Sequence, residues 1–116
     1  MVINIANEFS RVPAGRYLSD GPYSGEKFRQ MLLPLLRNQD EIIVELDGTA
    51  GYPSSFLEEA FGGLVRKEHF RADDLRRKLR IVARDHGYQS YVGAIWRHIE
   101  TADAGRKKAD DGLGVQ

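Results

Sequence analysis

The sequence predicts a single α/β domain with a mostly parallel mixed sheet covered by helices, in the order β-β-α-β-α-β-α. Short segments rich in β-branched residues alternate with segments whose apolar residues recur every three or four positions. The length of 116 residues is too short for two ordinary domains. A content of 41% hydrophobic and 29% charged residues is typical of a globular chain. We expect the domain to span residues 1–102 and a flexible polar tail to span 103–116.

The first half of the chain contains two predicted strands and one predicted helix. A first strand is expected at about 2–9, where β-branched residues open the chain. A short edge strand is expected near 15–18, because prolines and glycines surround it. Ser24 has the position of a helix N-cap, and the apolar spacing after it predicts a helix to about residue 36. Pro34 is expected to kink this helix or shift its start.

The second half begins with the clearest strand, at 41–47. Its nearly continuous apolar run, Ile42 to Leu46, predicts a strand covered on both faces. A helix is expected from Ser54 or Ser55 to Val65, and the paired glycines inside it indicate a close approach to the sheet or to another helix. The remaining elements are a helical turn at 71–78, a strand at 79–83 and a last helix at 88–99.

The loop between the central strand and the next helix is the candidate site, because parallel sheets gather their sites at the carboxyl ends of strands. Asp47 could hold a metal near a nucleotide, but acceptance of hydrogen bonds from loop N–H groups is the favoured interpretation. Ser55 and Glu58 have the spacing of a capping box, so at least one of Ser54 and Ser55 is expected to cap the helix. A phosphate at this helix start would meet unsatisfied N–H groups.

The segment from this strand into the helix resembles the STAS superfamily, whose members include bacterial anti-sigma-factor antagonists. In those proteins a strand ends in Asp, and Asp-Ser-Ser-Gly-Leu opens the next helix. Asp47 matches the Asp that ends the strand, Ser54 and Ser55 match the serine pair, and Leu57 matches the leucine. Within the superfamily the chain is most similar to the STAS-like domain family of unknown function. That family carries the run Ser-Ser-Phe-Leu-acidic-Glu-Ala-Phe-Gly-Gly-Leu, present here at 54–64.

A second segment, Ser-Gly-Glu-x-Phe-Arg at 24–29, is also similar to that family. The resemblance in element order covers roughly residues 2–100. The chain departs from the antagonists at two positions, where Pro53 replaces an Asp and Phe56 replaces a Gly. We expect Phe56 to add bulk where a partner approaches.

The resemblance implies a non-catalytic regulatory module of bacterial-type signalling, with no cofactor and no metal site. It implies that Ser54 is the phosphoacceptor of a serine-phosphorylation switch. The implied partner is a protein, either a histidine-kinase-like ATPase or an anti-sigma-type kinase. The expected partner-binding loop and helix start comprise Asp47, Thr49, Ser54, Ser55 and Glu58.

The alternative is nucleotide or nucleic-acid binding through the basic stretch from Arg66 to Arg84, which holds eight cations. Equal totals of 17 basic and 17 acidic residues favour a solvated face instead, so nucleic acid is not the expected partner. A small enzyme using Ser54 is the least favoured class, because Phe56 occupies the second glycine position of G-x-S-x-G.

The absence of cysteine excludes disulfides, thiolate nucleophiles and cysteine-ligated zinc. The first residues do not have the pattern of a signal peptide. No apolar stretch has the length that a bilayer requires. We therefore expect a cytoplasmic location and no membrane partner.

Overall fold

A parallel sheet of three strands organises the fold. The computed structural model describes residues 1–114, with side chains described through residue 109. The strands are β1 at Val2–Asn4, β2 at Ile42–Glu45 and β3 at Leu79–Val82, in the spatial order β1-β2-β3. Both strand pairs are parallel. The predicted α/β class is thus confirmed.

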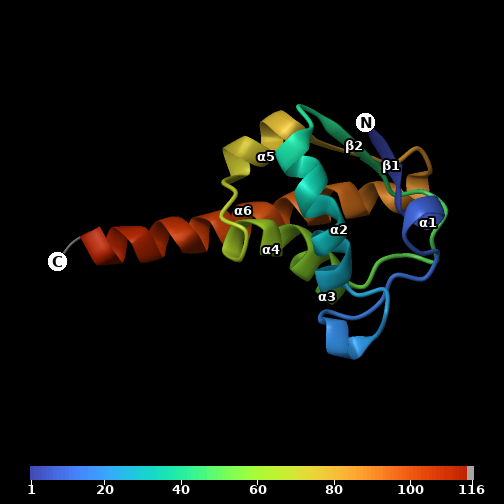
Figure 1. Cartoon of the computed structure of the whole chain (residues 1–116), viewed down its shortest axis with the longest axis horizontal. Helices are drawn as coiled ribbons and strands as arrows, with labels where there is room; N and C mark the ends of the chain where they lie inside the picture. The colour runs from blue at the N-terminus through green and yellow to red at the C-terminus, as the bar shows by residue number, and fades with distance from the viewer. Residues whose placement is uncertain (115–116) are drawn as a thin grey trace.

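Helical segments make up most of the remaining chain (Figure 1). Segment η2 is a π-helix, so α3, η2 and α4 form one helical run over 54–66. The bounds are α1 Ile5–Glu8, η1 Leu18–Asp20, α2 Gly25–Asn38, α3 Ser54–Leu57, η2 Glu58–Gly62, α4 Gly63–Arg66, α5 Ala72–Lys78, η3 His86–Tyr88 and α6 Gln89–Gly114.

One face of the sheet carries the hydrophobic core. The inward side chains of the strands are all buried: Ile3, Ile42, Val44, Leu79 and Ile81. They belong to one cluster with Phe28 of α2, Phe61 of η2 and Ile99 of α6. Because connections between parallel strands are right-handed, the sequential strand order places both connections on the same face. The helices therefore form a single layer on that face.

The opposite face of the sheet is open, so the prediction of cover on both faces is wrong. Val2 is 53% exposed on this face, and Ile43 is half-buried. Two ion pairs join β2 and β3, or the residues next to them, there: Arg80 Nε binds Glu41 Oε2 at 2.6 Å, and Arg84 Nη2 binds Glu45 Oε2 at 3.4 Å. The aliphatic stems of such arginines can cover apolar surface while their charged ends stay in water.

The first 25 residues differ from the predicted strands. The first strand ends at Asn4, because the Asn4 side chain accepts a hydrogen bond from Asn7 N and begins α1. No strand is assigned at the predicted edge segment 15–18. That segment does not pair with a strand. Instead, the carbonyls of Gly15 and Arg16 accept hydrogen bonds from the first residues of α2. The 3₁₀-helix η1 begins at Leu18, the last residue of that segment.

Helix α2 begins where the sequence predicts. The hydroxyl of Ser24 accepts a hydrogen bond from Lys27 N at 3.1 Å and is fully buried. Pro34 neither shifts this start nor ends the helix, which continues to Asn38. Proline has no backbone N–H, so the Gln30 carbonyl lacks its helical hydrogen-bond donor. Pro34 is exposed, and water can therefore reach this carbonyl.

Helix α6 crosses the helical layer and projects beyond it toward the C-terminus (Figure 1). It supplies Ile95, Ile99 and Ala102 to the core. The helix continues to Gly114 through most of the segment 103–116 for which we predict a flexible tail. The carboxylate of Asp103 is buried and accepts a hydrogen bond from Ala72 N at 3.3 Å. Residues 115–116 lie outside the described part of the chain.

Candidate functional site

Asp47 fixes the loop that follows β2. Its carboxylate accepts hydrogen bonds from Asp85 N at 2.8 Å and from Arg84 N at 3.0 Å, so it joins the carboxyl ends of β2 and β3. These two backbone donors lower the pKa of Asp47 below its ordinary value. The favoured interpretation of Asp47 as a hydrogen-bond acceptor is confirmed, with donors that come from the chain after β3.

Tyrosines hold the middle of the loop. Tyr52 is buried, and its hydroxyl donates to the Leu46 carbonyl at 2.6 Å. Burial raises the pKa of Tyr52 to about 12, so the phenol remains a donor at neutral pH. Tyr88 donates to the carbonyl of Thr49, whose own hydroxyl accepts from Gly51 N at 3.2 Å. These hydrogen bonds hold the loop backbone in one conformation.

The two serines lie at the start of α3 but do not cap it, so that prediction is wrong. The N-cap is Pro53, which has extended backbone angles and no side-chain donor or acceptor. A capping hydroxyl must come from the N-cap residue itself, whereas Ser54 and Ser55 are already helical. No side-chain hydrogen bond of either serine occurs within the described residues. Ser54 is exposed and Ser55 is half-buried.

Phe56 does not enlarge the surface of this loop, contrary to expectation. Its side chain is fully buried and contacts the rings of Phe9, Phe28 and Tyr52. At the position where the antagonists have glycine, this chain therefore places a core aromatic residue. The exposed surface at the helix start is left to Pro53 and Ser54.

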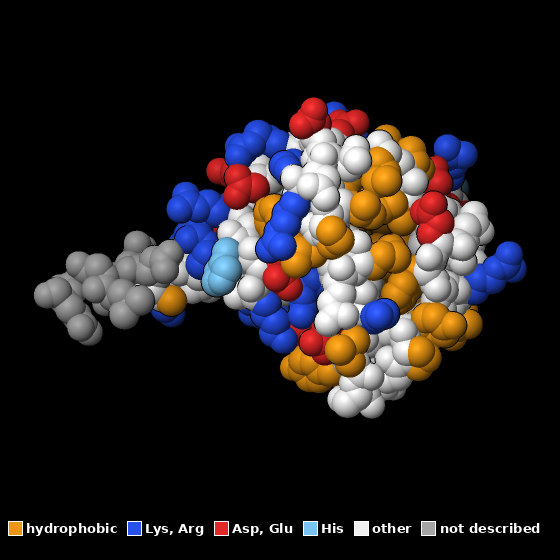
Figure 2. Space-filling model, viewed as in Figure 1, with side chains coloured by type: hydrophobic (Ala, Val, Ile, Leu, Met, Phe, Trp, Pro, Cys, Tyr) orange, Lys and Arg blue, Asp and Glu red, His pale blue; other side chains and the backbone are white. Residues whose placement is uncertain are grey.

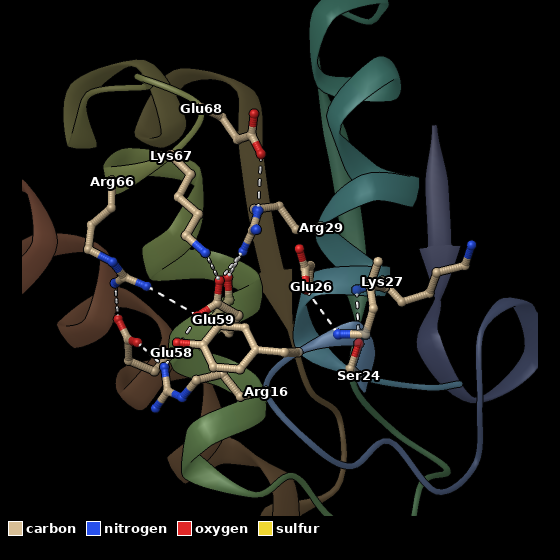
Figure 3. Close-up of polar contacts among 12 residues, drawn as sticks. Arg16, Ser24, Glu26, Lys27, Arg29, Glu58, Glu59, Arg66, Lys67 and Glu68 are labelled. Carbon is tan, nitrogen blue, oxygen red and sulfur yellow. Dashed lines mark hydrogen bonds and ion pairs between the residues drawn. The ribbon is translucent and has the colours of Figure 1, made fainter. Parts of the chain in front are cut away.

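Glu58 takes part in a charge cluster instead of a capping box. Its carboxylate binds Arg16 at 2.5 Å and also Arg66 (Figure 3). Arg16 lies 42 residues earlier in the chain, so no local spacing could indicate this pair. Burial favours the neutral acid, but the hydrogen bonds from Arg16 and Arg66 outweigh it and lower the pKa of Glu58.

The neighbouring residue, Glu59, is the buried centre of the same cluster. Only 1% of its side chain is exposed, and it binds Arg29 Nη1 at 2.7 Å and Lys67 Nζ at 3.2 Å. Arg29 is 3% exposed, and it also donates to the Glu59 carbonyl and to Glu68. Burial opposes ionisation here too, yet the hydrogen bonds from Arg29 and Lys67 lower the pKa of Glu59.

Arg29 and Glu59 unite the two sequence segments that carry the family resemblance. At Gly25, an added Cβ would lie 2.5 Å from the Phe56 carbonyl oxygen, so the start of α2 directly contacts the helical run 54–66. Gly63 leaves room for the Arg29 guanidinium, which an added Cβ would approach within 2.3 Å. The close approach predicted from the paired glycines is confirmed. The sequence-based prediction did not include this unit, although the arginine of segment 24–29 and the glutamate of segment 54–64 were its signal.

The basic stretch from Arg66 to Arg84 is largely neutralised by carboxylates. Six of its eight cations form ion pairs: Arg66, Lys67, Arg76, Arg77, Arg80 and Arg84. Lys78 instead donates to the Leu36 carbonyl at 2.7 Å. Figure 2 shows acidic and basic side chains next to one another around the α5 end of the molecule. This arrangement is typical of a solvated face and not of a phosphate-binding stripe.

Two further findings concern the described residues alone. No helix among them is long and apolar enough to cross a bilayer. No group of three or more histidine, cysteine, aspartate or glutamate side chains in residues 1–109 is placed to hold a metal ion.

The fold and the fixed loop define a small parallel α/β domain with an exposed serine at the helix after its central strand. A family model described as "STAS-like domain of unknown function (DUF4325)" matches residues 24–86. This range includes both segments joined by Arg29 and Glu59, and it covers more than half of the chain. The chain belongs to this STAS-like family. Comparisons with curated proteins and with solved structures give no match.

Membership of the family indicates a general role. STAS-like domains are generally non-enzymatic and often mediate protein–protein interactions.

Proposed function

We propose that the chain is a regulatory module that binds a protein partner through the loop from Asp47 to Ser55 and the first turn of α3. Ser54 is the phosphoacceptor that controls this binding. The observation that carries the proposal is the state of Ser54, which is exposed at the first position of α3 and has no capping role. By the resemblance to anti-sigma-factor antagonists, the partner is a histidine-kinase-like ATPase.

The fixed loop supports this proposal. Asp47 and the tyrosines at 52 and 88 hold the loop backbone before any partner arrives. Because the loop is already ordered, it loses little conformational entropy when a partner binds. The half-buried Ser55 and the exposed Pro53 would then flank Ser54 at the contact surface.

Phosphorylation would change the charge of this surface without unfolding the module. The Ser54 hydroxyl oxygen would attack the γ-phosphorus of ATP bound to the kinase, ADP would leave, and the hydroxyl proton would pass to a base of the kinase. The phosphoserine would add about two negative charges at the positive end of the helical run 54–66, which favours the folded state. The same charge would alter contact with the partner.

The test compares wild type with Ser54→Ala, Ser54→Asp and the matched control Ser55→Ala. Because neither serine caps α3, the free energy of unfolding of all three variants should lie within about 0.5 kcal/mol of the wild-type value. Ser54→Asp should weaken binding to a histidine-kinase-like ATPase of the same organism, and Ser54→Ala should bind but remain unphosphorylated. Intact mass after incubation with that ATPase and ATP measures the modification. The proposal would be contradicted if all four proteins bound the ATPase with equal affinity and none of them became phosphorylated.

A further inference from the structure

A groove lies between α4 and α6, away from the loop after β2. Its volume is about 530 Å³. The two helices run beside each other where α6 leaves the helical layer (Figure 1). A groove of this size is within the range of small-molecule sites, which is roughly 300–1,000 Å³.

The floor of the groove is apolar. Val65 and Ala102 form it, and both have at most 9% of their surface exposed. Gly105 continues the floor along α6, and an added Cβ there would meet no atom within 4 Å. The groove is therefore open above Gly105, and a side chain introduced there would project into free space.

The rim of the groove is cationic. Arg66 and Arg106 line it, together with Glu58. Among the described residues, two arginines and one glutamate thus line the groove, and Glu58 binds Arg66.

The π-helix positions the rim. Glu58 and Glu59 are adjacent in η2, yet Glu58 lines the groove. Glu59 is buried and binds Arg29 and Lys67 (Figure 3). Together the two glutamates hold the Arg66 guanidinium, through Nη1 at Glu58 and Nη2 at 3.5 Å from Glu59. A guanidinium has five N–H donors, so Arg66 keeps donors for a further acceptor. π-helical turns occur frequently at functional sites.

We propose that this groove binds a small apolar carboxylate. The apolar body of the ligand lies on Val65, Ala102 and Gly105, and its carboxylate accepts hydrogen bonds from Arg66. Carboxylates match the planar fork of arginine and form charge-assisted hydrogen bonds with it, which a neutral molecule does not. The site is independent of the proposed switch at Ser54.

The experiment titrates the ¹⁵N-labelled full chain with octanoate and, separately, with 1-octanol, which has the same alkyl chain without the carboxylate. Amide shifts should change around the groove with octanoate, and 1-octanol should bind at least about tenfold more weakly, because it lacks the charge-assisted hydrogen bonds. Gly105→Met should fill the groove and abolish the octanoate shifts. Gly93→Met, at an exposed glycine of the same helix beside the flexible end of Arg97, is the matched control and should bind as wild type does.

Arg66→Gln tests the head-group contact, with Arg84→Gln as the control at an exposed arginine on the open face of the sheet. Octanoate binding should weaken at least about tenfold in the first variant and stay unchanged in the second. Equal binding of octanoate and 1-octanol, or wild-type binding by Gly105→Met, would overturn the proposal. Absence of octanoate shifts around the groove would overturn it as well. Gly105→Met keeps the test decisive if Arg66→Gln fails to fold.

Discussion

Asp47 illustrates what a single residue contributes to this fold. In the sequence it is a carboxylate at the end of a strand, a position that serves metal binding as well as loop stabilisation. In the structure it bridges two strand ends, because it accepts hydrogen bonds from backbone N–H groups 37 and 38 residues away. The acceptor role could be predicted from chemistry, whereas the donors could not, because they lie on a distant segment.

Substitution Asp47→Asn should lower the free energy of unfolding by about 1 kcal/mol at pH 7, since it removes the charge from these hydrogen bonds. The pKa of Asp47 is lower in the fold than in the unfolded chain. Its stabilising contribution is therefore full above the ordinary carboxyl pKa of about 4 and is lost as the pH falls through the folded-state value. Urea unfolding at pH 7 and at about pH 2 measures this difference, and a gap of equal size at both pH values would contradict the assignment.

The serines and Glu58 show why side-chain roles at the site were harder to predict. A capping box depends on which residue has the extended backbone angles, and Pro53 takes that position one residue before Ser54. Glu58 is then free to bind Arg16, which the chain brings from a distant loop. Neither fact is present in the local spacing of residues.

At the scale of elements, the contact between α2 and the helical run 54–66 depends on a missing side chain. Gly25→Ala should destabilise the protein by about 1–3 kcal/mol, because the new Cβ would clash with the Phe56 carbonyl oxygen. Gly105→Ala is the matched control on α6 and should stabilise by about 1 kcal/mol through helix propensity, since its Cβ meets open space. Thermal unfolding of both variants tests the pair of predictions. A stabilising Gly25→Ala would show that the helices do not approach so closely.

The Arg29–Glu59 ion pair is the polar link between the same two elements. Arg29→Met should lower the free energy of unfolding by about 3–5 kcal/mol, because it leaves the buried Glu59 carboxylate without its main partner. The double variant Arg29→Met/Glu59→Gln should cost less than the sum of the single variants, with a coupling of about 1–3 kcal/mol. Chemical denaturation of the four proteins in this cycle gives the coupling. Additive costs would indicate that the two side chains act independently.

The elements themselves were predicted with uneven success for physical reasons. Apolar periodicity located α2 and the run 54–66, because long amphipathic helices repeat their pattern many times. The π-turn at η2 leaves no such pattern. The predicted edge strand at 15–18 failed because two backbone hydrogen bonds to the start of α2 satisfy that segment instead of a sheet.

At the scale of the whole molecule, charge pairing favours a protein partner over nucleic acid. The basic stretch is matched by nearby carboxylates, and the chain has 17 residues of each charge. Titration with duplex DNA or single-stranded RNA at low and moderate salt should show no submicromolar binding. Tight binding that weakens steeply with added salt would instead support the nucleic-acid alternative, because released counterions drive such binding.

The open face of the sheet could not be predicted from any single strand. The apolar run of β2 is typical of a strand covered on both faces, but cover depends on the spatial order of all three strands. Once that order is β1-β2-β3, the connections gather on one side. The ion pairs Glu41–Arg80 and Glu45–Arg84 then lie over the other side.

The position of α6 has a consequence for synthesis. This helix is the last element of the domain to leave the ribosome, yet it supplies Ile95 and Ile99 to the centre of the core. Until it emerges, the nascent sheet and the helical run 54–66 expose the apolar surface on which it will pack. Domains of this kind complete folding as a unit, so a nascent chain halted before residue 89 presents a surface for chaperones and not a finished module.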